Sequence, residues 1–113
     1  MELVNVRVSQ LNGCAFCLDL HTRQAREAGE SEQRLAVLPA WRDTALFDDT
    51  ERTALGLAEA LTHLPPGENR EAIFAKYRAQ LSPEQFSVLS WAVVAMNAFN
   101  RVSIISGHPV RPR

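Results

Sequence analysis

The sequence predicts an all-α fold, a single bundle of about five to six helices. Apolar residues recur at helical spacing along most of the chain, and the alternation typical of strands is not convincing anywhere. Capping residues, prolines or glycines bound nearly every apolar segment. The chain has 113 residues, of which 46% are hydrophobic, enough for one domain with its own core. We expect residues 1–113 to form that domain, with 106–113 as a mobile tail.

Residues that start or stop helices separate six expected helices. In order, these are Glu2–Leu11, Cys14–Ala28, Ser31–Leu38, Asp48–Leu64, Asn69–Gln80 and Pro83–Ile105. Four stop signals lie between them, namely Asn12-Gly13, Gly29, Pro39 and Pro65-Pro66-Gly67. The fourth and last helices each begin with a capping-box pattern, in which an Asp or Ser precedes a Glu or Gln by three residues.

The last expected helix is apolar on nearly all sides. Its large apolar residues include Phe86, Leu89, Trp91, Val93, Val94, Met96, Phe99 and Val102. Such a helix is normally buried on several sides, and the shorter helices offer too little surface to cover it. Because large exposed apolar patches usually mark interfaces, we expect the chain to self-associate.

Charge and composition give no reason to expect certain partners. The formal net charge is -1, and no basic cluster points to nucleic acid or to an anionic membrane. The first residues carry Glu2, Asn5 and Arg7, unlike a signal peptide, and we expect no membrane-spanning segment of about 20 apolar residues. We therefore expect a cytoplasmic protein.

The two cysteines lie together in a pattern that suggests redox chemistry. On a helix, Cys14, Cys17 and His21 would share one face because they are three and four residues apart. The start of the helix favours a thiolate at Cys14, whereas the neighbouring His21 favours one at Cys17. In a reducing compartment, a CxxC pair is more often catalytic or metal-binding than structural. Which thiol is the more reactive stays open at this point.

Glu2 joins this group if the first two helices form a hairpin. Glu2 precedes the Asn12-Gly13 turn by about ten residues and His21 follows it by about nine. At about 1.5 Å of rise per residue, both side chains would lie at a similar distance from the turn. The carboxylate could then orient the imidazole and raise its basicity.

Other interpretations of the cysteines remain. They could be unreactive core residues, or they could bind zinc with His21, although a structural zinc site needs a fourth ligand. The spacing excludes c-type haem because Leu18, not a histidine, follows Cys17. No flavin, haem or nicotinamide motif is present, so we expect the thiols to act without a cofactor.

The pattern as a whole resembles a known family. Glu2, eleven residues, Cys14-x-x-Cys17, three residues, His21, seven residues and Gly29 together resemble the signature of AhpD-like alkylhydroperoxidases in the carboxymuconolactone decarboxylase superfamily. Segments 3–10, 40–43 and 97–101 also look like that family. Members usually carry a helical segment before the glutamate, so a start further upstream stays open.

The resemblance implies an AhpD-like helical bundle with the CxxC at the N-terminus of its second helix. It also implies a thiol-dependent peroxidase in which Cys17 attacks a hydroperoxide and Cys14 resolves the product. His21 and Glu2 would form the proton relay, and an external dithiol, of lipoyl type, would restore the thiols. The expected assembly is a homo-oligomer, either a trimer or a hexamer.

Three other functions remain as alternatives. A redox sensor would oxidise once and turn over slowly, and a thiol-disulfide oxidoreductase would exchange disulfides with other proteins. The thioredoxin-like use of CxxC, however, expects a βαβ context that this helical chain lacks. A decarboxylase of the same superfamily is the third alternative, but such enzymes characteristically lack the CxxC.

Overall fold

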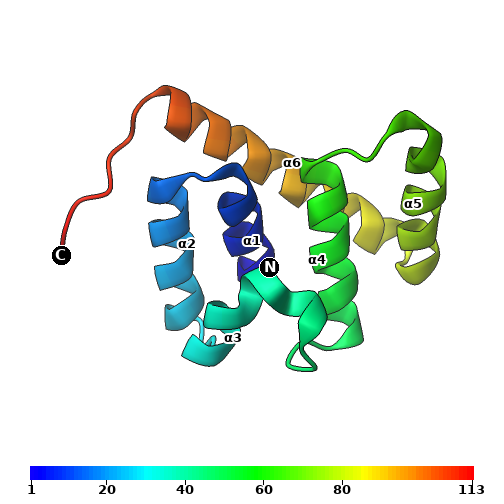
Figure 1. Ribbon diagram of the computed structural model, residues 1–113, viewed down its shortest axis with the longest axis horizontal. Helices are drawn as coiled ribbons and strands as arrows, with labels where there is room; N and C mark the ends of the chain where they lie inside the picture. Colours follow the sequence, from blue (N-terminus) through cyan, green and yellow to red (C-terminus); the bar gives the residue numbers. More distant parts are fainter.

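The structure, a computed structural model that describes residues 1–113, contains helices and no strands, as the sequence predicts. Its elements are, in order, α1 (Glu2–Asn12), α2 (Ala15–Glu27), α3 (Glu32–Val37), the 3₁₀ helix η1 (Leu38–Asp43), α4 (Asp49–Thr62), α5 (Gly67–Gln80) and α6 (Pro83–Ile105). In Figure 1, α1 lies between α2 and α4, α6 runs across the ends of these three helices, and α5 lies at the far end from α2.

The central helix α1 contributes to two apolar clusters. Val4 and Val8 pack with residues of α4 and α6, whereas Val6 packs with residues of α2, α3, η1 and α4. All three valines are almost fully buried. Since Val6 faces one cluster and its neighbours Val4 and Val8 face the other, this short helix holds the two halves of the bundle together.

Most helix starts agree with their sequence signals. The capping box at α4 is complete, because Asp48 accepts the Glu51 N–H at 2.8 Å and the Glu51 side chain accepts the Asp48 N–H at 2.9 Å. The box predicted at α6 is also complete, between Ser82 and Gln85. These reciprocal bonds satisfy backbone donors that a helix start otherwise leaves unpaired.

Several boundaries differ from the expected ones by one or two residues, and three differences have a clear local cause. The chain does not leave helical conformation at Pro39 but continues as η1, because proline is compatible with the first turn of a new helix. α5 begins at Gly67, within the expected stop signal, since Pro66 serves as its N-cap. Cys14 does not belong to the first turn of α2 but is its N-cap residue.

As expected from the sequence, the shorter helices do not cover α6, which is buried on one side only in the single chain. Only Leu89, Val93, Met96 and Asn100 of this helix are buried, and these four lie on one stripe. The opposite faces expose large apolar side chains, including Trp91 at 71% and Phe99 at 65%. The bundle covers one side of α6 because its neighbours α1 and α4 approach from that side only.

The sequence prediction of no membrane-spanning stretch also needs correction. α6 is long and apolar enough to cross a membrane by length and composition, with a mean hydropathy of 1.4. A packing helix of a helical bundle passes the same test, so this is weak evidence for a span. Side-chain hydrogen bonds of Asn97 and Asn100 attach α6 to α1 and α4. In this structure α6 is therefore a helix that packs within the bundle.

A half-buried glutamate of α4, Glu59, connects three elements. Glu59 accepts hydrogen bonds from Arg7 of α1 at 3.0 Å and from Trp41 of η1 at 2.9 Å, and it also pairs with Arg42. Burial alone would raise the pKa of the Glu59 carboxyl, but the three donors outweigh it and hold the pKa below its usual value. This contact fixes η1, including the buried Trp41, against α1 and α4.

A second polar network attaches the end of α1 to α6. Asn12 donates to the side-chain oxygens of Asn97 at 2.9 Å and Asn100 at 3.0 Å, and Asn100 donates to Ser9 at 3.1 Å. Asn100 and Ser9 are both fully buried. Because buried polar groups are costly to leave unpaired, the network specifies how α1 and α6 pack.

We predict that Asn100→Ala lowers the free energy of unfolding by about 1 to 3 kcal/mol, because it removes the hydrogen bonds that Asn100 forms with the buried Ser9 and with Asn12. Urea denaturation followed by circular dichroism measures this change. Asn69→Ala, at an exposed position of α5, is the matched control and should alter stability by less than about 0.5 kcal/mol. Equal stability of the two variants would contradict a structural role for the network.

Candidate active site at the Cys14–Cys17 pair

Cys14 closes one helix and opens the next. Gly13 takes a left-handed conformation, with φ of +68°, which glycine adopts without strain. The N–H of Gly13 then reaches the Gln10 carbonyl and the N–H of Cys14 reaches the Ser9 carbonyl, the pattern of a Schellman motif at the end of α1. On the other side, the Cys14 side chain accepts the Cys17 N–H as the N-cap of α2. Hydrogen bonds therefore hold Cys14 to both the end of α1 and the start of α2.

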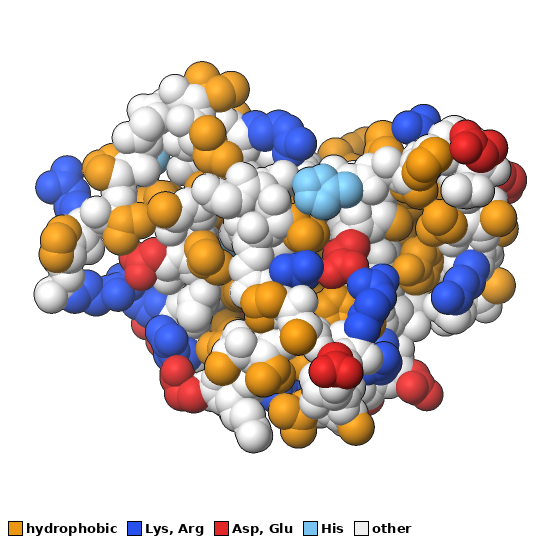
Figure 2. All heavy atoms as spheres, viewed as in Figure 1, with side chains coloured by type: hydrophobic (Ala, Val, Ile, Leu, Met, Phe, Trp, Pro, Cys, Tyr) orange, Lys and Arg blue, Asp and Glu red, His pale blue; other side chains and the backbone are white.

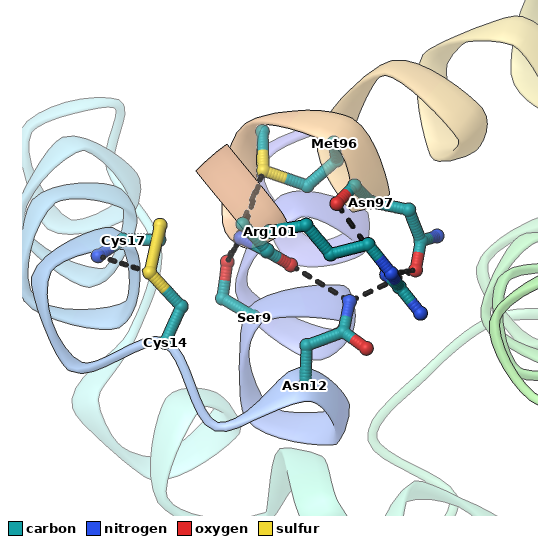
Figure 3. Close-up of a disulfide and its surroundings, with 8 residues drawn as sticks. Ser9, Asn12, Cys14, Cys17, Met96, Asn97 and Arg101 are labelled. Atoms are coloured by element: carbon teal, nitrogen blue, oxygen red, sulfur yellow. Dashed lines mark hydrogen bonds between the residues drawn. A yellow bond between two sulfur atoms is a disulfide. The ribbon is translucent and has the colours of Figure 1, made fainter. Parts of the chain in front are cut away.

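The two cysteines form a disulfide with each other. Cys14 and Cys17 are joined through their Sγ atoms, and their Cα atoms lie 5.3 Å apart. Figure 3 shows this bond at the start of α2, with the Cys17 N–H directed at the Cys14 sulfur at 3.2 Å. Both residues are buried, at 1% and 5% exposure. The pair lies at the helix start, as predicted, and it can exist as a disulfide without any rearrangement of the backbone.

The hairpin of α1 and α2 brings Glu2 to His21. The distance from Glu2 Oε2 to His21 Nδ1 is 3.7 Å, close enough for an ion pair but longer than a hydrogen bond. Both atoms are buried, and neither has a hydrogen-bond partner. The other oxygen of Glu2 accepts a hydrogen bond from Asn5 at 2.7 Å, which orients the carboxylate. A small approach of the two side chains would allow the Glu2 carboxylate to accept an Nδ1–H and leave Nε2 free to exchange a proton.

An apolar cavity of about 310 Å³ lies between α2 and the C-terminal half of α6. Its lining includes Cys17 and His21, together with the apolar side chains of Phe16, Leu20, Phe99 and Val102. Cys14 is not among the lining residues. A molecule in the cavity therefore meets the Cys17 side of the disulfide and the His21 ring, but not Cys14.

The C-terminal residues of the chain also line this cavity, which the sequence did not indicate. Ser103, Ser106 and His108 belong to its wall, and the His108 ring lies edge-on to Phe16 with 4.2 Å between ring centroids. The Ser103 hydroxyl is buried without a hydrogen-bond partner. The spacing of Phe99, Val102, Ser103 and Ser106 places them on one helical stripe, but that pattern cannot show which helix the stripe faces.

The side chains do not provide a metal site. No group of three His, Cys, Asp or Glu residues has a geometry suited to a metal ion, and the two sulfurs are bonded to each other. His21 faces the Glu2 carboxylate.

Comparisons with known proteins identify the family of this chain. Residues 1–60, which contain all four predicted site residues, match the model of the carboxymuconolactone decarboxylase family. The uncharacterized protein YdfG of Bacillus subtilis is 39% identical over 107 residues, which are 95% of this chain and 73% of YdfG. The uncharacterized protein YnjA of Escherichia coli is 39% identical over 65 residues, 58% of this chain and 36% of YnjA.

A solved structure shares the whole fold. The protein ATU0492 from Agrobacterium tumefaciens, of unknown function and described as a candidate antioxidant defence protein, AhpD, superposes with a TM-score of 0.84 at 34% identity. The match covers 97% of this chain and 77% of that one. With this fold, the CxxC at the start of α2 and the family match, the chain belongs to the carboxymuconolactone decarboxylase family as an AhpD-like member.

Proposed function

We propose that this protein is a thiol-dependent peroxidase that reduces organic hydroperoxides through a dithiol and disulfide cycle of Cys14 and Cys17. The observation that carries the proposal is the asymmetric access to the pair, since Cys17 borders an apolar cavity beside His21 and Cys14 does not. The family takes its name from a decarboxylase, but decarboxylation makes no use of a cysteine pair able to form a disulfide. An AhpD-like relative described as a candidate antioxidant defence protein also supports redox chemistry.

In the oxidative half of the cycle, the Cys17 thiolate attacks the terminal oxygen of the hydroperoxide. The O–O bond breaks, the alkoxide leaves as an alcohol after taking a proton, and Cys17 becomes a sulfenic acid. The Cys14 thiolate then attacks the Cys17 sulfur and forms the disulfide, and hydroxide leaves as water after taking a second proton. Of the two imidazoles in the cavity wall, His21 and His108, we assign the supply and recovery of these protons to His21, because Glu2 lies behind it.

In the reductive half, an external thiolate attacks Cys17, because this sulfur lies on the cavity side. The Cys14 thiolate is then the leaving group, and the Cys17 N–H and the start of α2 stabilise it. A second thiol of the reductant displaces Cys17 and completes the transfer of two electrons. The helix start therefore stabilises the Cys14 thiolate when it leaves, whereas the imidazole assists the Cys17 thiolate when it attacks the hydroperoxide. A cytoplasmic location suits this cycle because cytoplasmic reductants restore dithiols.

We predict that the two cysteine variants fail at different steps. Cys17→Ser should lose steady-state consumption of tert-butyl hydroperoxide with dithiothreitol, because the attacking thiol is missing. When the pre-reduced protein is freed of dithiothreitol, Cys14→Ser should consume about one equivalent of the hydroperoxide and stop at a sulfenic acid that dimedone traps at Cys17.

The two serine variants are matched controls for each other because each removes one sulfur. Full turnover by Cys17→Ser would contradict the assignment of the attacking thiol. A wild-type protein that oxidises once and does not turn over would be a redox sensor instead of a peroxidase.

We predict that His21→Gln lowers kcat/KM for tert-butyl hydroperoxide by about 10²- to 10⁴-fold, the usual contribution of a positioned proton-transfer group. Glu2→Gln should lower it less and should shift the pH profile of kcat/KM, because Glu2 acts through His21. His63→Gln is the matched control, since His63 lies outside the cavity. An unchanged rate in His21→Gln would exclude the proposed relay.

We also propose that the active form is a homo-oligomer assembled through the exposed apolar faces of α6. Trp91, Phe99 and Val102 are 71%, 65% and 62% exposed in the single chain, and Phe99 and Val102 also line the cavity. Burial of such side chains against another copy gains roughly 25 cal/mol for each Å² of apolar surface. The resemblance to AhpD-like proteins implies a trimer or a hexamer.

We predict that light scattering at micromolar concentration gives a multiple of the 12.6 kDa chain mass. Trp91→Glu should shift the mass towards the monomer because it places a charge in the apolar contact. Ala79→Glu adds the same charge at an exposed position of α5 and should leave the mass unchanged. A wild-type mass of 12.6 kDa would exclude self-association at that concentration.

A further inference from the structure

A second recess adjoins the cavity at Cys17. It has a volume of about 350 Å³ and lies between α2 and the C-terminal residues 108–113. Figure 1 shows this tail leaving α6 and descending beside α2, and Figure 2 shows Lys and Arg side chains gathered on the same edge of the molecule. The tail therefore forms a wall of two neighbouring spaces.

The recess is rich in guanidinium groups. Arg23 of α2 and Arg111 and Arg113 of the tail line it, and Asp19 is its only acidic side chain. Arg113 pairs with Asp19 at 2.6 Å, which holds the end of the tail against α2. Arg23 and Arg111 form no ion pair, so two positive charges in the recess are not compensated by a side chain.

The two spaces meet at one pair of rings. Phe16 and His108 line both the apolar cavity and the recess, and their centroids are 4.2 Å apart at an interplanar angle of 64°. An elongated molecule that passes this pair would have one end beside Cys17 and the other beside Arg23 and Arg111. Planar guanidinium groups suit a carboxylate because they can donate two parallel hydrogen bonds to it.

We propose that the molecule that reacts at Cys17 is an amphipathic organic acid, whose carboxylate binds Arg23 and Arg111 and whose apolar body passes the Phe16–His108 pair. This inference rests on the proposed thiol chemistry at Cys17. Two kinds of reactant fit the description, a carboxylated dithiol that reduces the disulfide and a carboxylated hydroperoxide that oxidises the thiols.

The dithiol arm of the test needs no peroxide. Dihydrolipoate and dihydrolipoamide carry the same dithiol, but dihydrolipoate ends in a carboxylate and dihydrolipoamide ends in a neutral amide. With either one, a thiolate attacks Cys17 and expels the Cys14 thiolate, and the second thiol then displaces Cys17 and closes a cyclic disulfide. Acid quenching followed by alkylation and mass spectrometry measures the rate at which the Cys14–Cys17 disulfide is reduced.

We predict that wild-type protein is reduced about 2- to 10-fold faster by dihydrolipoate than by dihydrolipoamide, as expected for two exposed charge contacts. The ratio should fall towards one in Arg23→Gln with Arg111→Gln, and also in 1 M salt, which screens the contacts. Arg26→Gln is the matched control, because Arg26 lies on the same helix, outside the recess and paired with Glu32. It should keep the wild-type ratio.

The hydroperoxide arm compares linoleic acid hydroperoxide with its methyl ester, each in a single oxidation of the reduced protein. A preference for the acid in either arm, lost in the double arginine variant, supports the proposal and shows whether the ligand is the reductant or the peroxide. Equal rates within both pairs, or ratios that the double variant does not change, would overturn it. A protein that no peroxide oxidises but that prefers dihydrolipoate would disprove the peroxidase function and leave the carboxylate site standing.

Discussion

The attachment of Asn12 to α6 is the interaction on which the site depends. Two side-chain oxygens of α6, those of the half-buried Asn97 and the buried Asn100, accept hydrogen bonds from the Asn12 amide at the point where α1 ends. From this point, Gly13 turns the chain in a conformation that glycine adopts without strain, and Cys14 begins α2. The hairpin that results places Glu2 opposite His21, which is nineteen residues away in the sequence, with 3.7 Å between Glu2 Oε2 and His21 Nδ1. A change of the turn would move the thiols and the relay together.

The difference between the two sulfurs follows from this local geometry. Cys14 faces the helix start, where it accepts the Cys17 N–H, and Cys17 faces the cavity with His21. A buried sulfur with a backbone donor is suited to leave as a thiolate, whereas a sulfur beside a cavity and an imidazole is suited to attack. In the proposed cycle, the dipole of α2 and the imidazole of His21 therefore do not compete for one role, because they act on different cysteines at different steps.

One face of α6 packs in the core of the bundle, and another face lines the cavity. Its buried stripe carries Leu89, Val93, Met96 and Asn100 and packs against α1 and α4. Another part of the same helix, with Phe99, Val102 and Ser103, forms a wall of the cavity next to α2. A helix that supports the α1 turn and lines the cavity couples the fold to the site, since its position fixes both the sulfur and the space in front of it.

The all-α class, most helix starts and the grouping of Cys14, Cys17 and His21 could be predicted from the sequence, because caps, stop signals and helical spacing are local properties. The position of Glu2 opposite His21 could also be predicted, by counting residues on either side of the Asn12-Gly13 turn. The role of Cys14 as N-cap, the 3₁₀ helix after Pro39 and the contacts of His108 and Ser103 with the cavity could not be predicted. They depend on which surfaces meet when distant segments pack. The pattern of residues along one helix does not show which other helix it packs against.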